Sequence, residues 1–240
     1  MSVLVLRPQP EADETAEALR ARGHAVVVSP LLAVRPGDPP PSGPFDAVAV
    51  TSPRALPALA QLPAVTEGPG ARPPLFAVGE RCAALAEAAG WRVAAVAADA
   101  RGLVAPLADH LVALLADHRT PAGDAPRTLY AAPAEPAFDL AGALRARGAD
   151  VTAWTAYRTV PRPLTAEARA ALREGASVLL SSPRIAEAFA QAWRALDPAP
   201  RGQTRLLAIS PAAARPMAKL QGVRVEIAGA ATLAGLLELL

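Results

Sequence analysis

The sequence predicts an α/β protein built from two doubly wound parallel sheets, and three observations predict it. Short apolar runs alternate with amphipathic helical segments along the 240 residues, as in parallel strands joined by helices. The strand-like runs are continuously apolar, which is typical of strands covered on both faces. Several segments of the first half also recur, in the same order, in the second half.

The recurrence consists of three matched pairs of segments. Leu-Arg-Ala-Arg-Gly begins at both Leu19 and Leu144, and each copy precedes an apolar run. Val-Ala-Val-Thr-Ser-Pro-Arg at 48–54 matches Val-Leu-Leu-Ser-Ser-Pro-Arg at 178–184, and Leu-Phe-Ala-Val-Gly at 75–79 matches Leu-Leu-Ala-Ile-Ser at 206–210. The offsets are 125, 130 and 131 residues. We therefore expect two related halves, because such ordered self-similarity is the signature of internal repetition.

The individual elements follow from apolar periodicity and from helix-ending glycines such as Gly23 and Gly90. In the first half we expect strands at 3–6, 24–28, 47–50, 75–78 and 91–96, and helices at 11–22, 53–61, 80–89 and 102–116. In the second half we expect strands at 128–131, 150–153, 177–180, 205–209 and 223–227, and helices at 138–147, 183–195, 212–220 and 232–240.

Composition excludes several classes of function. The chain is 52% apolar and 19% charged, with a net charge of +2, which is too small for a nucleic-acid-binding footprint. Cys82 is the single cysteine, so neither a disulfide within the chain nor a cysteine-based metal site is expected. No secretory leader or membrane-length apolar run is apparent, and we expect a cytoplasmic protein without membrane contact.

Polar residues that suit anion binding follow several of the expected strands. Parallel sheets bind ligands beyond the carboxyl ends of their strands, where helix N-termini present N–H groups. We expect two such edges to face one another and to bind a polycarboxylate or polyphosphate. Ordinary N-capping is the alternative for these loops. The candidate binding residues are Arg7, Thr51, Ser52, Gly79, Ser181, Ser182 and Ser210.

No nucleotide-, serine-hydrolase- or zinc-type motif is present in the sequence. The expected site therefore consists of amides, hydroxyls and arginines, and we expect no cofactor and no metal.

An ordered set of motifs resembles the uroporphyrinogen-III synthase family over nearly the whole chain. The set comprises Val-Leu-Val-Leu-Arg-Pro at 3–8, Phe-Asp-Ala-Val-Ala-Val-Thr-Ser at 45–52, Phe-Ala-Val-Gly at 76–79, Arg-Gly-Ala-Asp-Val-Thr at 147–152 with Tyr-Arg-Thr at 157–159, Val-Leu-Leu-Ser-Ser at 178–182 and Leu-Ala-Ile at 207–209. The resemblance implies two flavodoxin-like domains joined by a two-stranded hinge. One domain would combine 1–34 with 161–240 and the other would span 44–152, with crossings at 35–43 and 153–160.

The resemblance also implies an activity. Members of the family are cofactor-free lyases of haem biosynthesis that close the linear tetrapyrrole hydroxymethylbilane into uroporphyrinogen III, losing water and inverting ring D. The eight carboxylates of this substrate suit the candidate binding residues. Tyr157 matches the family tyrosine implicated in protonating the leaving hydroxyl, and a phenol is a weak acid at neutral pH. An aromatic side chain that only packs at the hinge is the alternative for Tyr157.

The sequence departs from the family pattern at Arg54, Cys82, Ala137 and Ala212–Ala214, where the family tends to carry hydroxyl, amide or arginine side chains. These departures keep open a second function, a non-catalytic two-domain module that binds a tetrapyrrole or another polycarboxylate. In either case we expect a monomer, with transient contact to the preceding enzyme of the pathway as the one protein partner.

Overall fold

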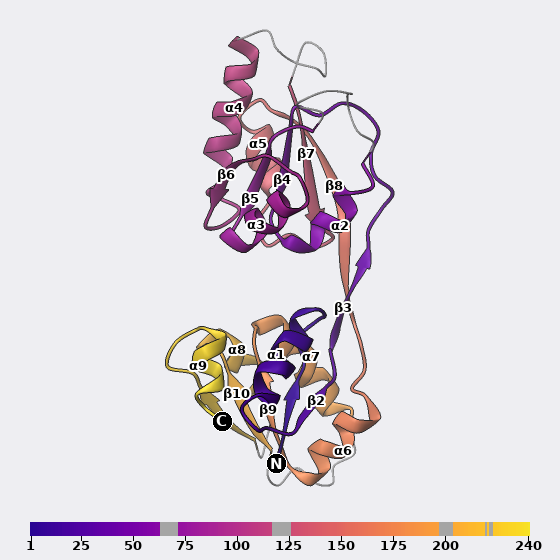
Figure 1. Cartoon of the computed structure of the whole chain (residues 1–240), viewed down its shortest axis with the longest axis vertical. Helices are drawn as coiled ribbons and strands as arrows, with labels where there is room; N and C mark the ends of the chain where they lie inside the picture. Colours follow the sequence, from indigo (N-terminus) through magenta and orange to yellow (C-terminus); the bar gives the residue numbers. More distant parts are fainter. Residues whose placement is uncertain (63–71, 117–125, 197–203, 219, 221–222) are drawn as a thin grey trace. The chain divides into compact units, whose positions relative to one another are not determined.

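The computed structural model describes residues 1–62, 72–116, 126–196, 204–218, 220 and 223–240. The chain divides into two compact units, each with its own parallel sheet between helices (Figure 1). Unit 1 contains Met1–Val34 and Val160–Leu240, and unit 2 contains Arg35–Thr159. The α/β, doubly wound prediction is confirmed.

Unit 1 is built on a five-stranded sheet with the order β11-β10-β9-β1-β2, in which all neighbours run parallel. Numbered along the chain within the unit, this order is 2-1-3-4-5, the order of flavodoxin-like sheets. The strands are β1 (Ser2–Val5), β2 (Val26–Val28), β9 (Ala176–Leu180), β10 (Arg205–Ala208) and β11 (Arg224–Ile227).

Strand β1 shows why unit 1 needs helices on both faces. Leu4 and Leu6 are buried in one cluster with α6 and α7, whereas Val3 and Val5 are buried in another with α1 and α9. Each face of the strand therefore contributes to its own core. The helices are α1 (Glu11–Arg20), α6 (Ala166–Glu174), α7 (Pro183–Arg194), α8 (Pro211–Ala214), η2 (Arg215–Met217, a 3₁₀ turn) and α9 (Leu233–Leu237).

Unit 2 is built on a six-stranded sheet with the order β3-β8-β7-β4-β5-β6. The five strands from β4 to β8 are paired in parallel. Numbered 1 to 5 along the chain and read from the β6 edge, their order in the sheet is 3-2-1-4-5. The strands are β3 (Leu32–Pro36), β4 (Ala47–Val50), β5 (Leu75–Val78), β6 (Val93–Ala97), β7 (Arg127–Pro133) and β8 (Asp150–Pro161).

Helices cover both faces of this sheet as well. One face is covered by α4 (Val104–Ala116) and α5 (Leu140–Arg145). The core on this face contains Leu107 and Leu111 of α4, Leu140 and Leu144 of α5, and Ala47, Ala49, Phe76 and Tyr130 of the strands. Val48 and Val50 point to the other face and are fully buried. That face is covered by α3 (Glu80–Ala88) and by a short turn formed by η1 (Pro53–Ala55) and α2 (Leu56–Leu59).

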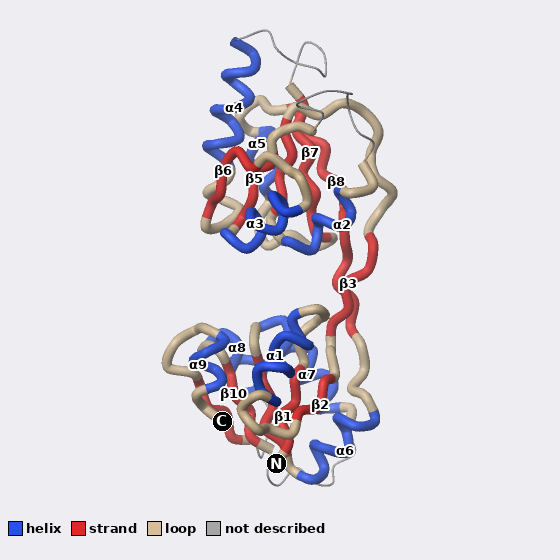
Figure 2. The backbone as a smooth tube through the Cα atoms, in the orientation of Figure 1, coloured by secondary structure: helices blue, strands red, loops and turns tan. Residues whose placement is uncertain are grey.

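The edge strand β3 lies beside the long strand β8 (Figure 2). Beyond the end of β3, the amide of Gly37 donates to the carbonyl of Ala156 at 3.1 Å, and that of Asp38 donates to Thr155 at 2.8 Å. A Cβ on Gly37 would overlap the Thr155 carbonyl. Glycine at residue 37 therefore allows the two segments to approach closely.

The internal repeat corresponds to equivalent places in the two sheets. The segment at 19–28 is α1 followed by β2, and its match at 144–153 begins in α5 and runs into β8. The other two matches pair β4 with β9 and β5 with β10. Reading the two sheets as β2-β1-β9-β10-β11 and β8-β7-β4-β5-β6 places each matched pair at the same position. The related segments thus form two similar sheets whose strands occur in a different order along the chain.

Several element predictions were wrong in detail. The helix expected at 53–61 is a 3₁₀ turn and a single α-turn, because Pro57 has no N–H to donate to Pro53. The helix expected at 212–220 likewise changes to a 3₁₀ turn before Pro216, and Lys219 lies outside the described residues. Helix α6 was not predicted, although Thr165 caps its start and Gly175 follows its end with φ +88°. Strand β8 has 12 residues, against the four expected.

Candidate active site

The candidate residues concentrate where the order of the strands reverses. In unit 1 this switch lies between β1 and β9, and in unit 2 it lies between β4 and β7. Adjacent loops leave the sheet in opposite directions at such a point and leave room for a ligand at the carboxyl ends of the strands. Arg7 and Ser181–Ser182 follow the two strands in unit 1, and Thr51–Ser52 follow β4 in unit 2. Strand order therefore supports the ligand-binding interpretation of these positions.

Three candidate serines are helix N-caps. Ser52 Oγ accepts from the Arg54 amide at 3.3 Å, Ser182 Oγ from the Ile185 amide at 3.2 Å, and Ser210 Oγ from the Ala213 amide at 3.3 Å. The capping alternative is thus realised in the structure. A capping hydroxyl still holds its own proton, which it can donate to a carboxylate, so capping and substrate binding are compatible roles.

Gly79 contributes conformation to the site. It caps α3 with φ +78° and ψ 142°, a combination that suits glycine. Its amide already donates to the Ala97 carbonyl at 2.9 Å, and the place where a Cβ would point is open. Gly79 therefore leaves free space at the start of α3 and does not offer its own N–H to a ligand.

Arg7 is held against the first helix of unit 1. Its Nη1 donates to Thr15 Oγ1 at 3.2 Å, and Thr15, which is fully buried, donates in turn to the Glu11 carbonyl at 2.8 Å. One of the five guanidinium N–H groups is used in this contact. The side chain is thereby positioned at the carboxyl end of β1, with further donors available for a carboxylate.

Thr51 contacts a tyrosine that the sequence analysis missed. Thr51 Oγ1 lies 3.2 Å from the hydroxyl of Tyr130, which is on β7 and only 2% exposed. Burial raises the pKa of Tyr130, the hydrogen bond with Thr51 lowers it, and the nearby Tyr157 and Asp139 raise it. The two tyrosines of the chain therefore share one electrostatic environment at this edge of the sheet. The sequence did contain a signal for Tyr130: both tyrosines lie in the second half of the chain, on or just after expected strands.

Tyr157, the candidate acid, is buried in β8 with 7% of its surface exposed. Its carbonyl accepts from the Ala134 amide at 3.0 Å, and a register shift between β7 and β8 pairs it with Pro133. The bulge accommodates one extra residue of β8 at the carboxyl end of β7. Tyr157 is thus placed next to the switch point of unit 2.

Ser181 differs from its counterpart Thr51. Its Oγ is buried and has no hydrogen-bond partner in the described part of the chain. A buried hydroxyl without a partner is costly, so Ser181 lacks the hydrogen bond that stabilises the equivalent hydroxyl of Thr51.

The departures from the family pattern occupy different environments. Cys82 is buried on α3, and burial raises the pKa of its thiol to about 11, so the thiol is protonated and unreactive at neutral pH. Ala213 is fully buried and Ala212 is exposed. Ala137 is exposed in the loop after β7, next to Phe138, whose ring lies under the guanidinium of Arg101. Arg101 is a second residue that the sequence analysis missed.

Two further properties concern the residues that the structure describes. No group of three or more His, Cys, Asp or Glu side chains there could hold a metal ion. Within the same ranges, no helix is both long enough and apolar enough to cross a membrane.

The fold and the site together define a class: a doubly wound α/β protein of two units, with hydroxyl-bearing helix caps and arginines at the carboxyl ends of its strands. Comparison with protein families makes this class specific. The model of the family described as uroporphyrinogen-III synthase HemD matches residues 13–238. The chain belongs to the uroporphyrinogen-III synthase family, whose enzymes act in haem biosynthesis.

Solved structures of similar fold carry the same description. The chain is similar to uroporphyrinogen-III synthetase from Helicobacter pylori, with 19% identity, a TM-score of 0.59 and coverage of 100% of this chain and 98% of that one. It is also similar to a mutant uroporphyrinogen III synthase from Thermus thermophilus, with 19% identity, a TM-score of 0.52 and coverage of 99% and 96%. A comparison with curated protein sequences found no match.

Proposed function

We propose that this protein closes hydroxymethylbilane to uroporphyrinogen III, with loss of water and inversion of ring D. Membership of the uroporphyrinogen-III synthase family over residues 13–238 is the observation that carries this proposal. The residues at the strand ends suit such a substrate, because they bring hydroxyl donors and arginines to a molecule with eight carboxylates.

The substrate carboxylates are bound by hydroxyl and guanidinium donors. Ser52, Ser182 and Ser210 accept from helix amides, and each hydroxyl keeps a proton to donate. In unit 1, Arg7 and Ser182 follow the strands at the switch point and Ser210 follows β10, and in unit 2, Thr51 and Ser52 follow β4. A hydrogen bond to a charged group contributes about 1.5–3 kcal/mol. Several such contacts suffice to hold a flexible linear tetrapyrrole in one folded conformation.

Tyr157 supplies the proton for the first chemical step. Its hydroxyl proton passes to the hydroxymethyl oxygen of ring A, the C–O bond breaks, and water leaves while the pyrrole nitrogen electron pair stabilises the azafulvenium cation. The resulting phenolate is paired with this cation. Because Tyr157 is buried and interacts electrostatically with the buried Tyr130, charge interactions of the acid are stronger than in water.

Ring closure then depends on positioning. The substituted carbon of ring D attacks the cation and forms a spiro-pyrrolenine. The bond from this carbon to the bridge carbon of ring C breaks, which leaves the positive charge on ring C and its bridge carbon, and that bridge carbon then bonds to the free α-carbon of ring D. Loss of a proton from ring D, with Tyr157 as acceptor, restores the aromatic pyrrole and the phenol. Correct folding of the bound chain favours this path over direct closure at the free carbon.

Product isomers test the proposal. Purified protein is mixed with freshly generated hydroxymethylbilane, and the products are oxidised and separated. Formation of isomer III above the spontaneous background is the expected result. If only isomer I accumulates, at the rate seen without protein, the proposal is wrong and the chain is a binding module.

A further inference from the structure

The two equivalent hydroxyls at the switch points have different surroundings. Thr51 and Ser181 match in the internal repeat and follow the equivalent strands β4 and β9. Thr51 Oγ1 is 3.2 Å from Tyr130 Oη, whereas Ser181 Oγ has no partner in the described residues. Sheet register explains the difference: β4 residue Ala49 pairs with Tyr130, and the matching residue of β9, Leu179, pairs with Val5. Only unit 2 therefore places a phenol beside this hydroxyl.

Tyr130 is suited to orient its neighbour. Its side chain is in the core formed by α4, α5 and the sheet, and only 2% of its surface is exposed. Burial raises the pKa of Tyr130, the hydrogen bond with Thr51 lowers it, and Tyr157 and Asp139 raise it, so that the pKa lies above its ordinary value. The phenol therefore keeps its proton at neutral pH, and a hydroxyl that keeps its proton remains a hydrogen-bond donor.

We propose that Tyr130 is a positioning residue of the substrate site: it donates its proton to Thr51 Oγ1 and thereby turns the Thr51 proton toward a substrate carboxylate. The inference deepens the proposed function and rests on it. Thr51 Oγ1 accepts one hydrogen bond from the fixed phenol and has one proton to donate, so its donor direction is set before substrate arrives. Ser181 lacks such a partner in the described residues, so no equivalent group sets its proton direction.

Steady-state kinetics of Tyr130→Phe test this role. The substitution keeps the ring in the core and removes only the hydroxyl. We expect KM for hydroxymethylbilane to rise about three- to tenfold, the effect of one lost hydrogen bond, while kcat stays within about twofold of wild type. A purely structural role would lower the melting temperature or the active fraction and leave KM unchanged. Unchanged KM in the folded variant overturns the inference.

A double-mutant cycle tests whether Tyr130 acts through Thr51. Thr51→Val keeps the branched shape and removes the hydroxyl, and Thr51→Ser retains the hydroxyl as a conservative control. If Tyr130 acts through this hydroxyl, adding Tyr130→Phe to Thr51→Val produces no further rise in KM. Multiplication of the two effects would contradict the inference.

Thr128 offers a matched control on the same strand. It is fully buried, two residues before Tyr130, and its Oγ1 has no partner among the described residues. Thr128→Val removes a hydroxyl from the same core, and KM and kcat should both equal those of wild type. An equal rise in KM would attribute the Tyr130 effect to general loosening of the core and would overturn the inference.

Direct binding separates this inference from the proposed function. The stable octacarboxylate uroporphyrin III is titrated into wild type and Tyr130→Phe while tryptophan fluorescence is recorded. If the wild type binds uroporphyrin III but does not form isomer III, the proposed function alone is contradicted. A three- to tenfold higher Kd for Tyr130→Phe would then still support the role of Tyr130, because one lost hydrogen bond costs about 1 kcal/mol. Equal Kd values overturn that role, and a wild type that neither binds nor reacts overturns both.

Discussion

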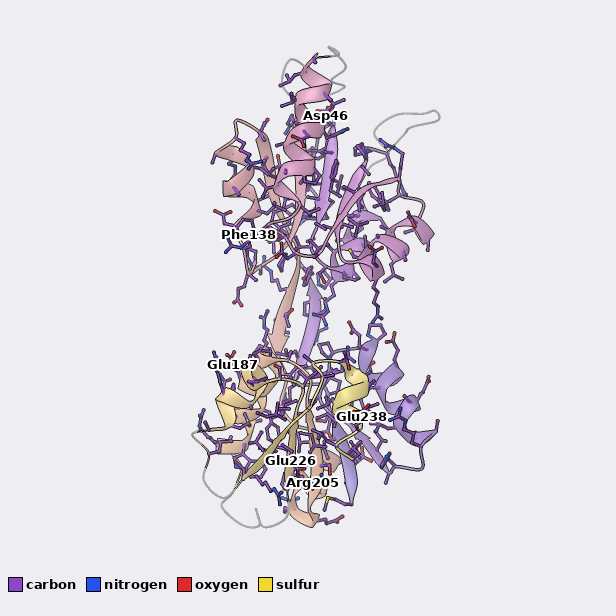
Figure 3. The ribbon with its side chains drawn as sticks, turned by 90° about the vertical axis from the view of Figure 1, so that its left-hand side faces the viewer. Asp46, Phe138, Glu187, Arg205, Glu226 and Glu238 are labelled. Atoms are coloured by element: carbon purple, nitrogen blue, oxygen red, sulfur yellow. The ribbon has the colours of Figure 1, made fainter. Side chains whose placement is uncertain are left out.

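The guanidinium of Arg101 stacks on Phe138, with its Cζ 4.7 Å from the ring centroid. Arg101 follows β6 and Phe138 follows β7, so the contact joins two loops at the carboxyl edge of the unit 2 sheet. Figure 3 shows Phe138 near one end of unit 2 and Asp46, which precedes β4, near the other. The resemblance implies an arginine at the position of the neighbouring Ala137, and the stacked Arg101 brings a cation to the same loop.

We therefore expect Arg101 to replace that missing arginine in binding a carboxylate. Arg101→Met should raise KM for hydroxymethylbilane about tenfold, because a charge-assisted hydrogen bond is lost while apolar contact with Phe138 is retained. Arg101→Lys should keep part of the affinity. The measurement is KM with product isomers resolved. A KM for Arg101→Met equal to that of wild type would show that Arg101 only packs on Phe138.

Tyr157→Phe tests the proton donor. The substitution should lower kcat about 10²- to 10⁴-fold, the usual contribution of general acid catalysis, and should change KM little. Single-turnover formation of isomer III measures the step, and the melting temperature checks that β8 still forms. A variant that turns over at the wild-type rate would leave Tyr157 with a packing role only.

Ser182 allows capping and substrate binding to be separated. Ser182→Ala removes both functions and should lower the free energy of unfolding by about 1 kcal/mol. Ser182→Asp can still accept from the Ile185 amide, so it should retain stability. Its carboxylate has no proton to donate and repels the substrate, so KM should rise more than in Ser182→Ala. Chemical denaturation and kinetics on the same two variants check this, and equal KM values would argue against a carboxylate contact.

The substituted loop after β10 gives a gain-of-function test. Ala212 is exposed, whereas Ala213 is fully buried in the core of unit 1. Ala212→Thr should be tolerated and should lower KM by adding a donor beside Ser210. Ala213→Thr should destabilise the protein by about 1–3 kcal/mol through overpacking. Similar stability and similar KM for the two variants would contradict this division.

How far the sequence predicts this molecule depends on the range of the interactions. The strands were found because continuous apolar runs are a local property, and the Thr/Ser-Pro caps because capping acts within three residues. The hydrogen bond between Thr51 and Tyr130 joins residues 79 positions apart, and it exists only because β4 and β7 are neighbours in a particular register. Arg101 and Phe138 come together for the same reason, through strand order that periodicity does not reveal.

Contacts far from the site fix the two units. In unit 1, Arg205 on β10 and Glu226 on β11 point toward one another (Figure 3), and Arg205 Nε donates to Glu226 Oε1 at 3.0 Å. Arg205 Nη2 also donates to the Leu239 carbonyl at 2.8 Å. In unit 2, Asp46 accepts from the Arg127 amide at 2.7 Å. These contacts belong to residues that are not candidates for the site, unlike the capping serines, which have both roles in the proposed function.

His110 makes the stability of unit 2 depend on pH. Its ring on α4 packs on Phe76, and the ring centroids are 5.4 Å apart. Burial lowers the pKa of His110, and the charge of Arg92 lowers it further. A hydrogen bond with the backbone of Asp46 and the charge of Asp46 raise it, but the pKa remains below its ordinary value. The unfolded chain, with an ordinary histidine pKa of about 6.5, therefore binds a proton more readily than the folded one. The stabilisation is complete above that pH and is lost as the pH falls through the lower folded-state value.

The variant His110→Gln isolates this contribution, because glutamine is neutral at every pH. Between pH 8 and pH 5, we expect the melting temperature of the wild type to fall more than that of His110→Gln. The difference in melting temperature, variant minus wild type, should therefore increase as the pH falls. Carboxylate titrations common to both proteins cancel in this difference. Parallel melting curves across the range would mean that protonation of His110 costs the folded state nothing.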